Sequence, residues 1–219
     1  MTNKVLILVP HADDEVLGFG GIISKLVDQS FDVTVTFLQA PNNLRAEKQL
    51  EASKLAKNIL GYNHANYLYL SNELLCNNTF NLIQIVEQHI IEVNPDTIYT
   101  TSLGDNHQDH KNLYRAVSIA CRPAGYTNVK SVYTGEVISS YDQSFSCEKA
   151  FFVPNVYEVL SEDHLNRKIN ALQAYKTEIR DFPHPRSIEQ IKAKAISRGA
   201  ECNYNYAEAF MLLRGINNV

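Results

Sequence analysis

Cysteine is scarce in this 219-residue sequence, and no two cysteines stand in the C-x-x-C spacing of a zinc or redox motif. The four that are present lie far apart, at Cys76, Cys121, Cys147 and Cys202, which argues against a disulfide framework. Residues 1–4 lead directly into a short apolar run, without the longer apolar region of a secretory signal peptide. No apolar run approaches the roughly 18 residues that a membrane helix needs. We therefore expect free thiols, a cytoplasmic location and no integral membrane segment.

Concentrated basic charge is also lacking. The chain carries 20 lysines and arginines against 24 aspartates and glutamates, for a formal net charge of −4. Because no segment is strongly basic, the composition does not indicate a nucleic-acid partner or an anionic membrane surface. The length suits one domain. We predict a single domain over residues 1–219, with a core in 1–140 and additions in 141–219.

The chain does contain a regular alternation of strand-like and helix-like segments. Apolar and β-branched runs predict strands at 4–9, 31–38, 67–70, 97–101 and 131–139, and the segments between them predict helices at 15–28, 44–60, 80–93 and 109–121. Such alternation is typical of parallel βαβ units. We predict an α/β fold, Rossmann-like and doubly wound, whose mostly parallel sheet has the order 3-2-1-4-5.

The alternation weakens after residue 140. Helices are predicted at 161–175 and at 187–197, where Ser187 begins a capping-box pattern. Short strands are predicted near 151–154 and 156–160, and residues 206–214 form a last element of undetermined type. We therefore expect C-terminal helical additions to the sheet.

A first group of ionisable residues follows the first predicted strand directly: His11, Asp13, Asp14 and Glu15. Imidazole and carboxylate groups together suit zinc and similar divalent metals. His11 and Asp14 are three residues apart around a turn, so both side chains can point the same way. The alternative is helix capping by Asp13, with Asp14 and Glu15 favoured by the helix dipole, but this does not explain His11.

A second group follows the fourth predicted strand and includes Asp105, His107, Asp109 and His110. Taken alone, it could be a polar loop with a capping aspartate. In the predicted sheet order, however, strands one and four are neighbours at the topological switch point, where ligands bind beyond the carboxyl ends of the strands. The two groups therefore meet in one crevice, which favours a metal site with further acid and base groups beside it.

Three other features of the sequence give weaker evidence of a functional role. Gly18, Gly20 and Gly21 lie within the predicted helix rather than in the turn before it, so they favour close packing over dinucleotide binding. Arg45 opens the second helix near the same crevice, although such an arginine is usually a surface residue. His184 stands between two prolines in a rigid turn that could overhang the pocket or simply lead into the next helix.

Residues 10–15, Pro-His-Ala-Asp-Asp-Glu, resemble the Pro-His-Pro-Asp-Asp-Glu signature of the LmbE-like family. This family includes the N-acetylglucosaminyl-phosphatidylinositol de-N-acetylases (PIG-L) and the deacetylases of mycothiol and bacillithiol synthesis. Residues 107–110, His-Gln-Asp-His, are similar to its His-Pro-Asp-His motif. Weaker likenesses at 45–61 and 198–210 extend the resemblance over nearly the whole chain. Ala12 and Gln108 stand where the family has prolines, and the loop at 39–43 is shorter.

The resemblance implies one zinc ion per chain, held by His11, Asp14 and His110. It also implies Asp13 as general base, His107 as the group that stabilises the oxyanion or protonates the amine, and Asp109 as the partner of His107. Substrate binding is expected of Arg45, with His184 as a further candidate. Fe²⁺ remains an alternative metal, and family members often form homo-oligomers.

The expected activity is hydrolytic removal of an N-acetyl group from an amino sugar or its conjugate. Two alternatives stay open: a phosphoesterase with two metal ions, and a non-catalytic sugar- or nucleotide-binding module.

Overall fold

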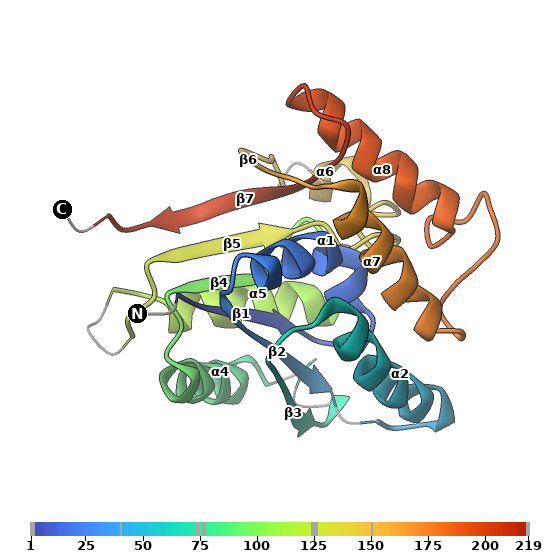
Figure 1. Cartoon of the computed structure of the whole chain (residues 1–219). Helices are drawn as coiled ribbons and strands as arrows, with labels where there is room; N and C mark the ends of the chain where they lie inside the picture. The colour runs from blue at the N-terminus through green and yellow to red at the C-terminus, as the bar shows by residue number, and fades with distance from the viewer. Residues whose placement is uncertain are drawn as a thin grey trace.

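The computed structural model describes residues 3–39, 41–72, 75, 78–123, 127–149 and 151–217. Seven strands form one sheet in the order β3-β2-β1-β4-β5-β7-β6 (Figure 1). The first five strands are parallel to one another and stand in the predicted order 3-2-1-4-5. The α/β doubly wound fold is therefore confirmed, and the sheet extends it by two antiparallel strands.

The strands and helices of the first part alternate closely as predicted. The strands are β1 (Lys4–Val9), β2 (Asp32–Gln39), β3 (His64–Leu70), β4 (Thr97–Thr101) and β5 (Ser131–Gly135), and the helices are α1 (Asp14–Asp28), α2 (Leu44–Leu60), α4 (Thr79–Val93) and α5 (Gln108–Ala120). Helix α2 has the predicted bounds because a capping residue stands at each end. The side chain of Asn43 accepts a hydrogen bond from the Ala46 N–H, and Gly61 ends the helix in the left-handed conformation at φ 84°.

The C-terminal part contains both of the expected helices and two strands. Its elements are α6 (Ser146–Lys149), β6 (Val156–Val159), α7 (Glu162–Ala174), α8 (Ile188–Glu201) and β7 (Ala207–Gly215). Strand β7 lies between β5 and β6 and is antiparallel to both. The predicted strand at 151–154 does not form, and the element left undetermined at 206–214 is β7.

Helices cover both faces of the sheet, and two hydrophobic cores result. Successive residues of β1 point to opposite faces, so that Ile7 belongs to one core and Leu8 to the other. The first core is formed with α1, α2, α7 and α8, and the second with α4 and α5. Because both faces of β1 are buried, its carboxyl end is the part of the strand that can present polar groups to a ligand.

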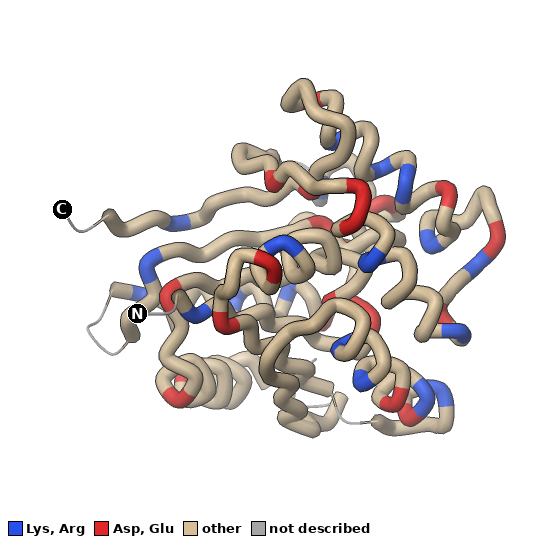
Figure 2. The backbone as a smooth tube through the Cα atoms, viewed as in Figure 1, with Lys and Arg blue, Asp and Glu red and all other residues tan. Residues whose placement is uncertain are grey.

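Charged residues of both signs are interspersed along the described chain (Figure 2). No helix in this part of the chain has the length and apolar character that crossing a membrane requires. Cys121, Cys147 and Cys202 are free, as expected. Cys76 and residues 1–2 lie outside the described residues. The single-domain organisation over 1–219 and the cytoplasmic location stay predictions.

Candidate metal centre and active-site cleft

A cleft of about 440 Å³ opens at the carboxyl ends of β1, β2 and β4. Seven of the eight predicted site residues line it: His11, Asp13, Asp14, Arg45, His107, Asp109 and His110. The two sequence groups, separated by about ninety residues of chain, are brought together because β1 pairs directly with β4. The cleft has the size of a small-molecule site.

Asp13 occupies the N-cap position of α1, but its side chain does not cap the helix. Asp13 has φ 133°, a conformation that L-residues rarely adopt, and its side chain makes no capping hydrogen bond. Its N–H instead donates to the buried carboxylate of Glu15 at 3.0 Å, and Tyr175 donates to the other oxygen of Glu15. Asp13 is therefore the N-cap residue by position, but the expected capping by its side chain is wrong, and a strained residue lies beside the cluster, as is common at functional sites.

The Asp14 carboxylate joins two histidines. Its Oδ2 lies 3.1 Å from His11 Nδ1 and 3.2 Å from His110 Nε2. One ring nitrogen from each of His11, His107 and His110 also lies within 4.8 Å of the other two. The side chains of Asp14 and His110 are almost fully buried, whereas that of His107 is 48% exposed. The cluster therefore offers nitrogen and oxygen donors in the separation range of a metal site.

Asp105 contacts the His110 ring nitrogen that faces away from Asp14. Its fully buried carboxylate lies 2.8 Å from His110 Nδ1, and the same oxygen accepts a hydrogen bond from the Ser140 hydroxyl at 2.8 Å. The other oxygen accepts from the His107 N–H. Carboxylates in this position fix the tautomer and orientation of a metal-ligating histidine. Asp105 was visible in the second sequence group, but its spacing alone assigned it no role.

A second network of side chains contacts Asp13. Arg186 Nη1 donates to Asp13 Oδ2 at 2.9 Å and to Glu178 Oε2 at 2.6 Å. Arg45 makes two contacts with Glu178, one of them from Nε to Oε1 at 2.8 Å. Glu178 is fully buried and was not predicted, since it follows α7 without any motif. The Arg45 guanidinium is thus engaged by a buried carboxylate at the edge of the cleft.

The two adjacent aspartates have opposite pKa shifts. Burial and the neighbouring Asp14 charge raise the pKa of Asp13 to about 7, against the opposing effect of Arg186. Burial also favours the protonated form of Asp14, but His110 and His11 outweigh it and hold the pKa of Asp14 well below its usual range. Asp14 is therefore the carboxylate that stays ionised, and Asp13 is the one poised near neutral pH.

The three histidines also differ in the direction of their pKa shifts. Burial alone would lower the pKa of His11 and of His110, but carboxylates raise it to about 9 in His11, chiefly through Asp14 and Asp109. Asp14 and Asp105 raise the pKa of His110 to about 10. Burial lowers the pKa of His107, and the other two histidines lower it further. His107 is thus the neutral imidazole of the group.

Two predicted partners are arranged differently from the expectation. Asp109 Oδ2 lies 2.9 Å from His11 Nε2 and 3.8 Å from His107 Nδ1, so its carboxylate is closer to His11 than to the histidine it was expected to orient. His184 does not line the cleft. Its Nδ1 accepts a hydrogen bond from the Arg186 N–H at 3.0 Å, so it braces the turn that carries Arg186. The roles of both residues stay predictions.

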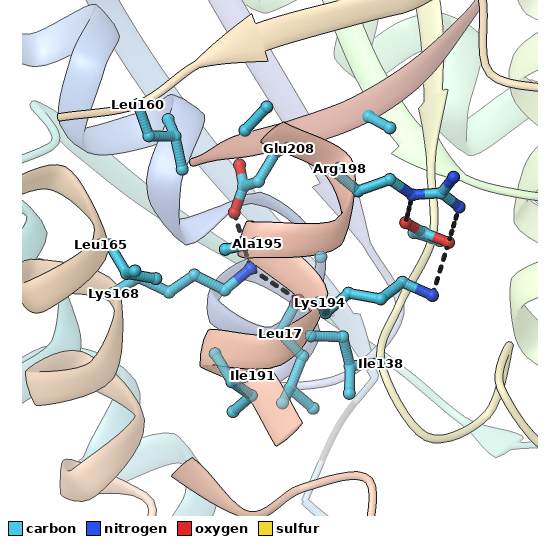
Figure 3. A pocket seen from close by; sticks show the side chains of 14 residues that line it. Leu17, Ile138, Leu160, Leu165, Lys168, Ile191, Lys194, Ala195, Arg198 and Glu208 are labelled. Atoms are coloured by element: carbon cyan, nitrogen blue, oxygen red, sulfur yellow. Dashed lines mark hydrogen bonds and ion pairs between the residues drawn. The ribbon is translucent and has the colours of Figure 1, made fainter. Parts of the chain in front are cut away.

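A second cavity, of about 20 Å³, lies between α1, α7, α8 and β7 (Figure 3). Lys168 donates to Glu208 at 2.6 Å and to the Leu17 carbonyl at 3.0 Å. The Glu208 carboxylate also accepts from the N–H groups of Gly21 and Ile22. Since its polar groups satisfy one another and it shares no residue with the cleft, this cavity belongs to the packing of the C-terminal helices.

Comparison with known proteins identifies the family of the chain. The family model described as "PIG-L: GlcNAc-PI de-N-acetylase" matches residues 6–121, which include both signatures. The chain belongs to this family. Among curated proteins, the "Uncharacterized deacetylase YaiS" of Escherichia coli (strain K12) is 24% identical over 180 residues, covering 79% of this chain and 90% of YaiS.

Solved structures of two other proteins have a similar fold. The N,N'-diacetylchitobiose deacetylase of Pyrococcus horikoshii is 17% identical, covers 97% of this chain and 84% of its own, and has a TM-score of 0.75. GalB of Pseudomonas putida KT2440, a 4-carboxy-2-hydroxymuconate hydratase, is 18% identical over the whole of both chains, with a TM-score of 0.71. Because this fold carries more than one reaction, the activity must be argued from the site.

Proposed function

We propose that this protein is a metal-dependent hydrolase that removes an N-acetyl group from an amino sugar or its conjugate. One observation carries the proposal: the buried Asp13 carboxylate lies beside an imidazole–carboxylate cluster inside an open cleft. Membership of a deacetylase family agrees with it, and the deacetylase neighbour that acts on diacetylchitobiose suggests an amino-sugar substrate.

The residues present fit a zinc ion. We assign His11, Asp14 and His110 as its ligands, because the Asp14 oxygen already lies within 3.2 Å of a nitrogen of each histidine and imidazole with carboxylate suits zinc or Fe²⁺. When bound, the ion would polarise the amide carbonyl and lower the pKa of a water molecule. His107 is the alternative third imidazole, and its exposure favours a role toward the substrate.

The other residues then supply proton transfer and positioning. Asp13 accepts the proton of the attacking water, and Arg186 fixes the Asp13 carboxylate through its 2.9 Å hydrogen bond. His107, a neutral imidazole at the exposed side of the cluster, donates a ring N–H hydrogen bond to the developing oxyanion, and the proton taken up by Asp13 passes to the leaving amine. A water adds to the amide carbon, the C–N bond breaks, and the products are acetate and a free amine.

Acetate release from N-acetylglucosamine and its glycosides tests the proposal directly. We expect release by the metal-loaded protein, loss after chelation and recovery when zinc or Fe²⁺ is returned. Full activity after complete metal removal would contradict the metal-dependent mechanism. Release of no acetate from any N-acetylated sugar would contradict the deacetylase assignment and leave the hydratase chemistry of GalB as a competing reading of the fold.

Metal counting separates the deacetylase from the phosphoesterase alternative. Within the described residues, one group of three side chains that could hold a metal is present, His11, His107 and His110, and it overlaps the proposed ligand set. We therefore expect one ion per chain by native mass spectrometry. Two ions about 3.5–4 Å apart would favour the phosphoesterase. Absence of bound metal, with indifference to His110→Ala, would favour a binding module.

A further inference from the structure

The backbone N–H of Asp13 is bound by a buried carboxylate. Asp13 has φ 133° and ψ −27°, in a region that L-residues rarely adopt. Its carbonyl accepts hydrogen bonds from the N–H groups of Val16 and Leu17 in α1, whereas its own N–H donates to Glu15 Oε2 at 3.0 Å. Such a conformation costs free energy and persists only where the surrounding structure fixes it. The Glu15 contact is therefore part of what fixes Asp13.

Glu15 lies in the first turn of α1 and is fully buried. The helix dipole stabilises a carboxylate at this end of a helix, whether the carboxylate is exposed or not. Burial of a carboxylate, in contrast, is costly unless the group is hydrogen-bonded. The dipole therefore does not account for the burial of Glu15, whereas its contact with the Asp13 N–H does.

The other oxygen of Glu15 is bound by Tyr175. Tyr175 is the C-cap residue of α7, and α7 packs against α1 (Figure 1). Its side chain is fully buried, and its hydroxyl donates to Glu15 Oε1. Two donors from separate segments thus hold the two oxygens of one carboxylate. Tyr175 also lies outside residues 6–121, the part of the chain that matches the family model.

The position of the Asp13 carboxylate limits its use as a general base. A base must lie within hydrogen-bond reach of the proton that it takes, and misplacement by about 1 Å can cost about 100-fold in rate. Arg186 contacts the Asp13 carboxylate at 2.9 Å, which restrains the side chain. The hydrogen bond to Glu15 acts on the backbone that carries this side chain.

We propose that Glu15 and Tyr175 are positioning residues for Asp13. The Tyr175 hydroxyl fixes the Glu15 carboxylate, and this carboxylate holds the Asp13 backbone in the conformation that presents the Asp13 side chain to the cleft. Neither Glu15 nor Tyr175 is among the described residues that line the cleft. The inference rests on the proposed deacetylase function and gives the C-terminal part of the chain a role in it.

Tyr175→Phe tests the proposal by removing one hydroxyl and keeping the ring. With the best substrate among N-acetylglucosamine and its glycosides, we expect kcat for acetate release to fall about 10–100-fold and KM to change less than about twofold. Metal affinity, measured by competition with a chromophoric chelator, should equal that of the parent protein, because no proposed ligand is altered. Unchanged kcat, or a loss of metal that accounts for the lost activity, would overturn the proposal.

Tyr62→Phe is the matched control. Tyr62 is also buried in the same hydrophobic core, and its hydroxyl donates to the Ser53 carbonyl at 3.5 Å. The substitution should change neither kcat nor KM. A fall in kcat as large as that of Tyr175→Phe would assign the effect to the loss of any buried hydroxyl, and it would overturn the positioning role.

Two substitutions of Glu15 separate hydrogen bonding from side-chain volume. Glu15→Gln keeps an oxygen for the Asp13 N–H, and its amide can donate to the Tyr175 hydroxyl, which is also an acceptor. Glu15→Met keeps the length of the side chain without the oxygens. We expect Glu15→Gln to retain most of kcat and Glu15→Met to lose about 100-fold, both with the metal affinity of the parent protein. Equal kcat values in the two variants would contradict the proposal.

Amide hydrogen exchange, followed by NMR in the metal-loaded protein, separates failure of this inference from failure of the proposed function. Exchange of the Asp13 N–H should be at least about tenfold faster in Tyr175→Phe than in the parent protein, and exchange at Ile7, within β1, should be accelerated less. If no substrate releases acetate but this local acceleration is present, the proposed function fails and the structural coupling of Tyr175 to Asp13 stands. Equal acceleration at the two amides, or none at Asp13, would overturn the inference even in an active deacetylase.

Discussion

Asp13 and Asp14 are chemically identical neighbours whose carboxylates face different partners. Asp14 contacts two imidazoles at 3.1 and 3.2 Å, whereas Asp13 contacts the Arg186 guanidinium at 2.9 Å. Asp13 also has a positive φ of 133°, and its side chain makes no capping hydrogen bond at the helix end. The two residues can therefore be tested as a matched pair, because an asparagine substitution preserves the size of each.

Asp13→Asn should retain metal and lose activity. Removing a positioned general base typically lowers kcat by about 10²–10⁴-fold, while the cluster of Asp14 with the histidines is left intact. Asp14→Asn should instead weaken metal binding. Metal content by mass spectrometry and acetate release separate the two effects. Loss of metal from the Asp13 variant and retention by the Asp14 variant would mean that the two roles are reversed.

Asp105→Asn should weaken metal binding without removing a ligand. The buried carboxylate orients His110 through a 2.8 Å contact at Nδ1, and loss of such a partner costs roughly 10–100-fold in metal affinity. Competition with a chromophoric chelator measures this affinity independently of activity. Ser140→Ala removes only a hydroxyl donor from the same carboxylate and should have a smaller effect. Equal affinities of parent and Asp105→Asn would contradict this role.

At the scale of elements, the close approach of α8 to the start of β7 depends on a glycine. A Cβ on Gly199 would lie 2.6–2.7 Å from backbone atoms of residues 204–206. Gly199→Ala should lower the free energy of unfolding by about 1–3 kcal/mol, as overpacking does, because backbone cannot move aside as a side-chain end can. Urea denaturation measures the change. Gly215→Ala, whose Cβ would meet only Leu212 at 3.5 Å, is the control and should change stability little.

The packing of α4 on β2 should make stability dependent on pH. The buried His89 ring nitrogen lies 2.9 Å from the Thr36 hydroxyl, and burial lowers the pKa of His89 below its usual 6.5. The unfolded chain therefore binds this proton more readily, and stability is lost as pH falls below about 6.5, by at most about 1.4 kcal/mol per pH unit. His89→Leu should reduce the slope of unfolding free energy against pH.

The hydroxyl partner provides the control for this pH effect. Thr36→Val removes the hydrogen bond but leaves the buried imidazole, so it should lower stability at every pH and preserve the slope. A slope that persists in His89→Leu would assign the acid sensitivity to another group.

The elements differ in how well the sequence predicts them, for physical reasons. Strands β1 and β4 are short apolar runs buried on both faces, and the order of the parallel strands follows from alternation with helices. Residues 206–214 were ambiguous, because YAEAFMLLR suits a helix as well as a strand, and only pairing with β5 and β6 decides it. The contacts of Glu178 with Arg45 and Arg186 were unpredictable, since they join three separate segments without a motif.

At the scale of the whole molecule, the candidate metal joins two βα units. His11 and Asp14 follow β1, and His110 lies in α5 after β4. A ligand that binds only the folded chain stabilises it by about 2.7 kcal/mol at 100 times its dissociation constant. Zinc should therefore raise the thermal midpoint in a concentration-dependent way, and Asp14→Ala should abolish this shift. An equal shift in the variant would place the stabilising metal elsewhere. Homo-oligomer formation stays a prediction.

The position of β7 also affects when the sheet can be completed during protein synthesis. A ribosome releases residues 207–215 after all the other strands, yet their place in the sheet is internal, between β5 and β6. Before residues 207–215 are synthesised, β5 is an edge strand of the nascent chain, and the Lys168 ammonium lacks the carboxylate of Glu208. The last of these seven strands to be synthesised therefore completes the sheet, and a chain truncated before Ala207 would leave the Lys168 cation without its carboxylate partner and a strand edge open to association with other chains.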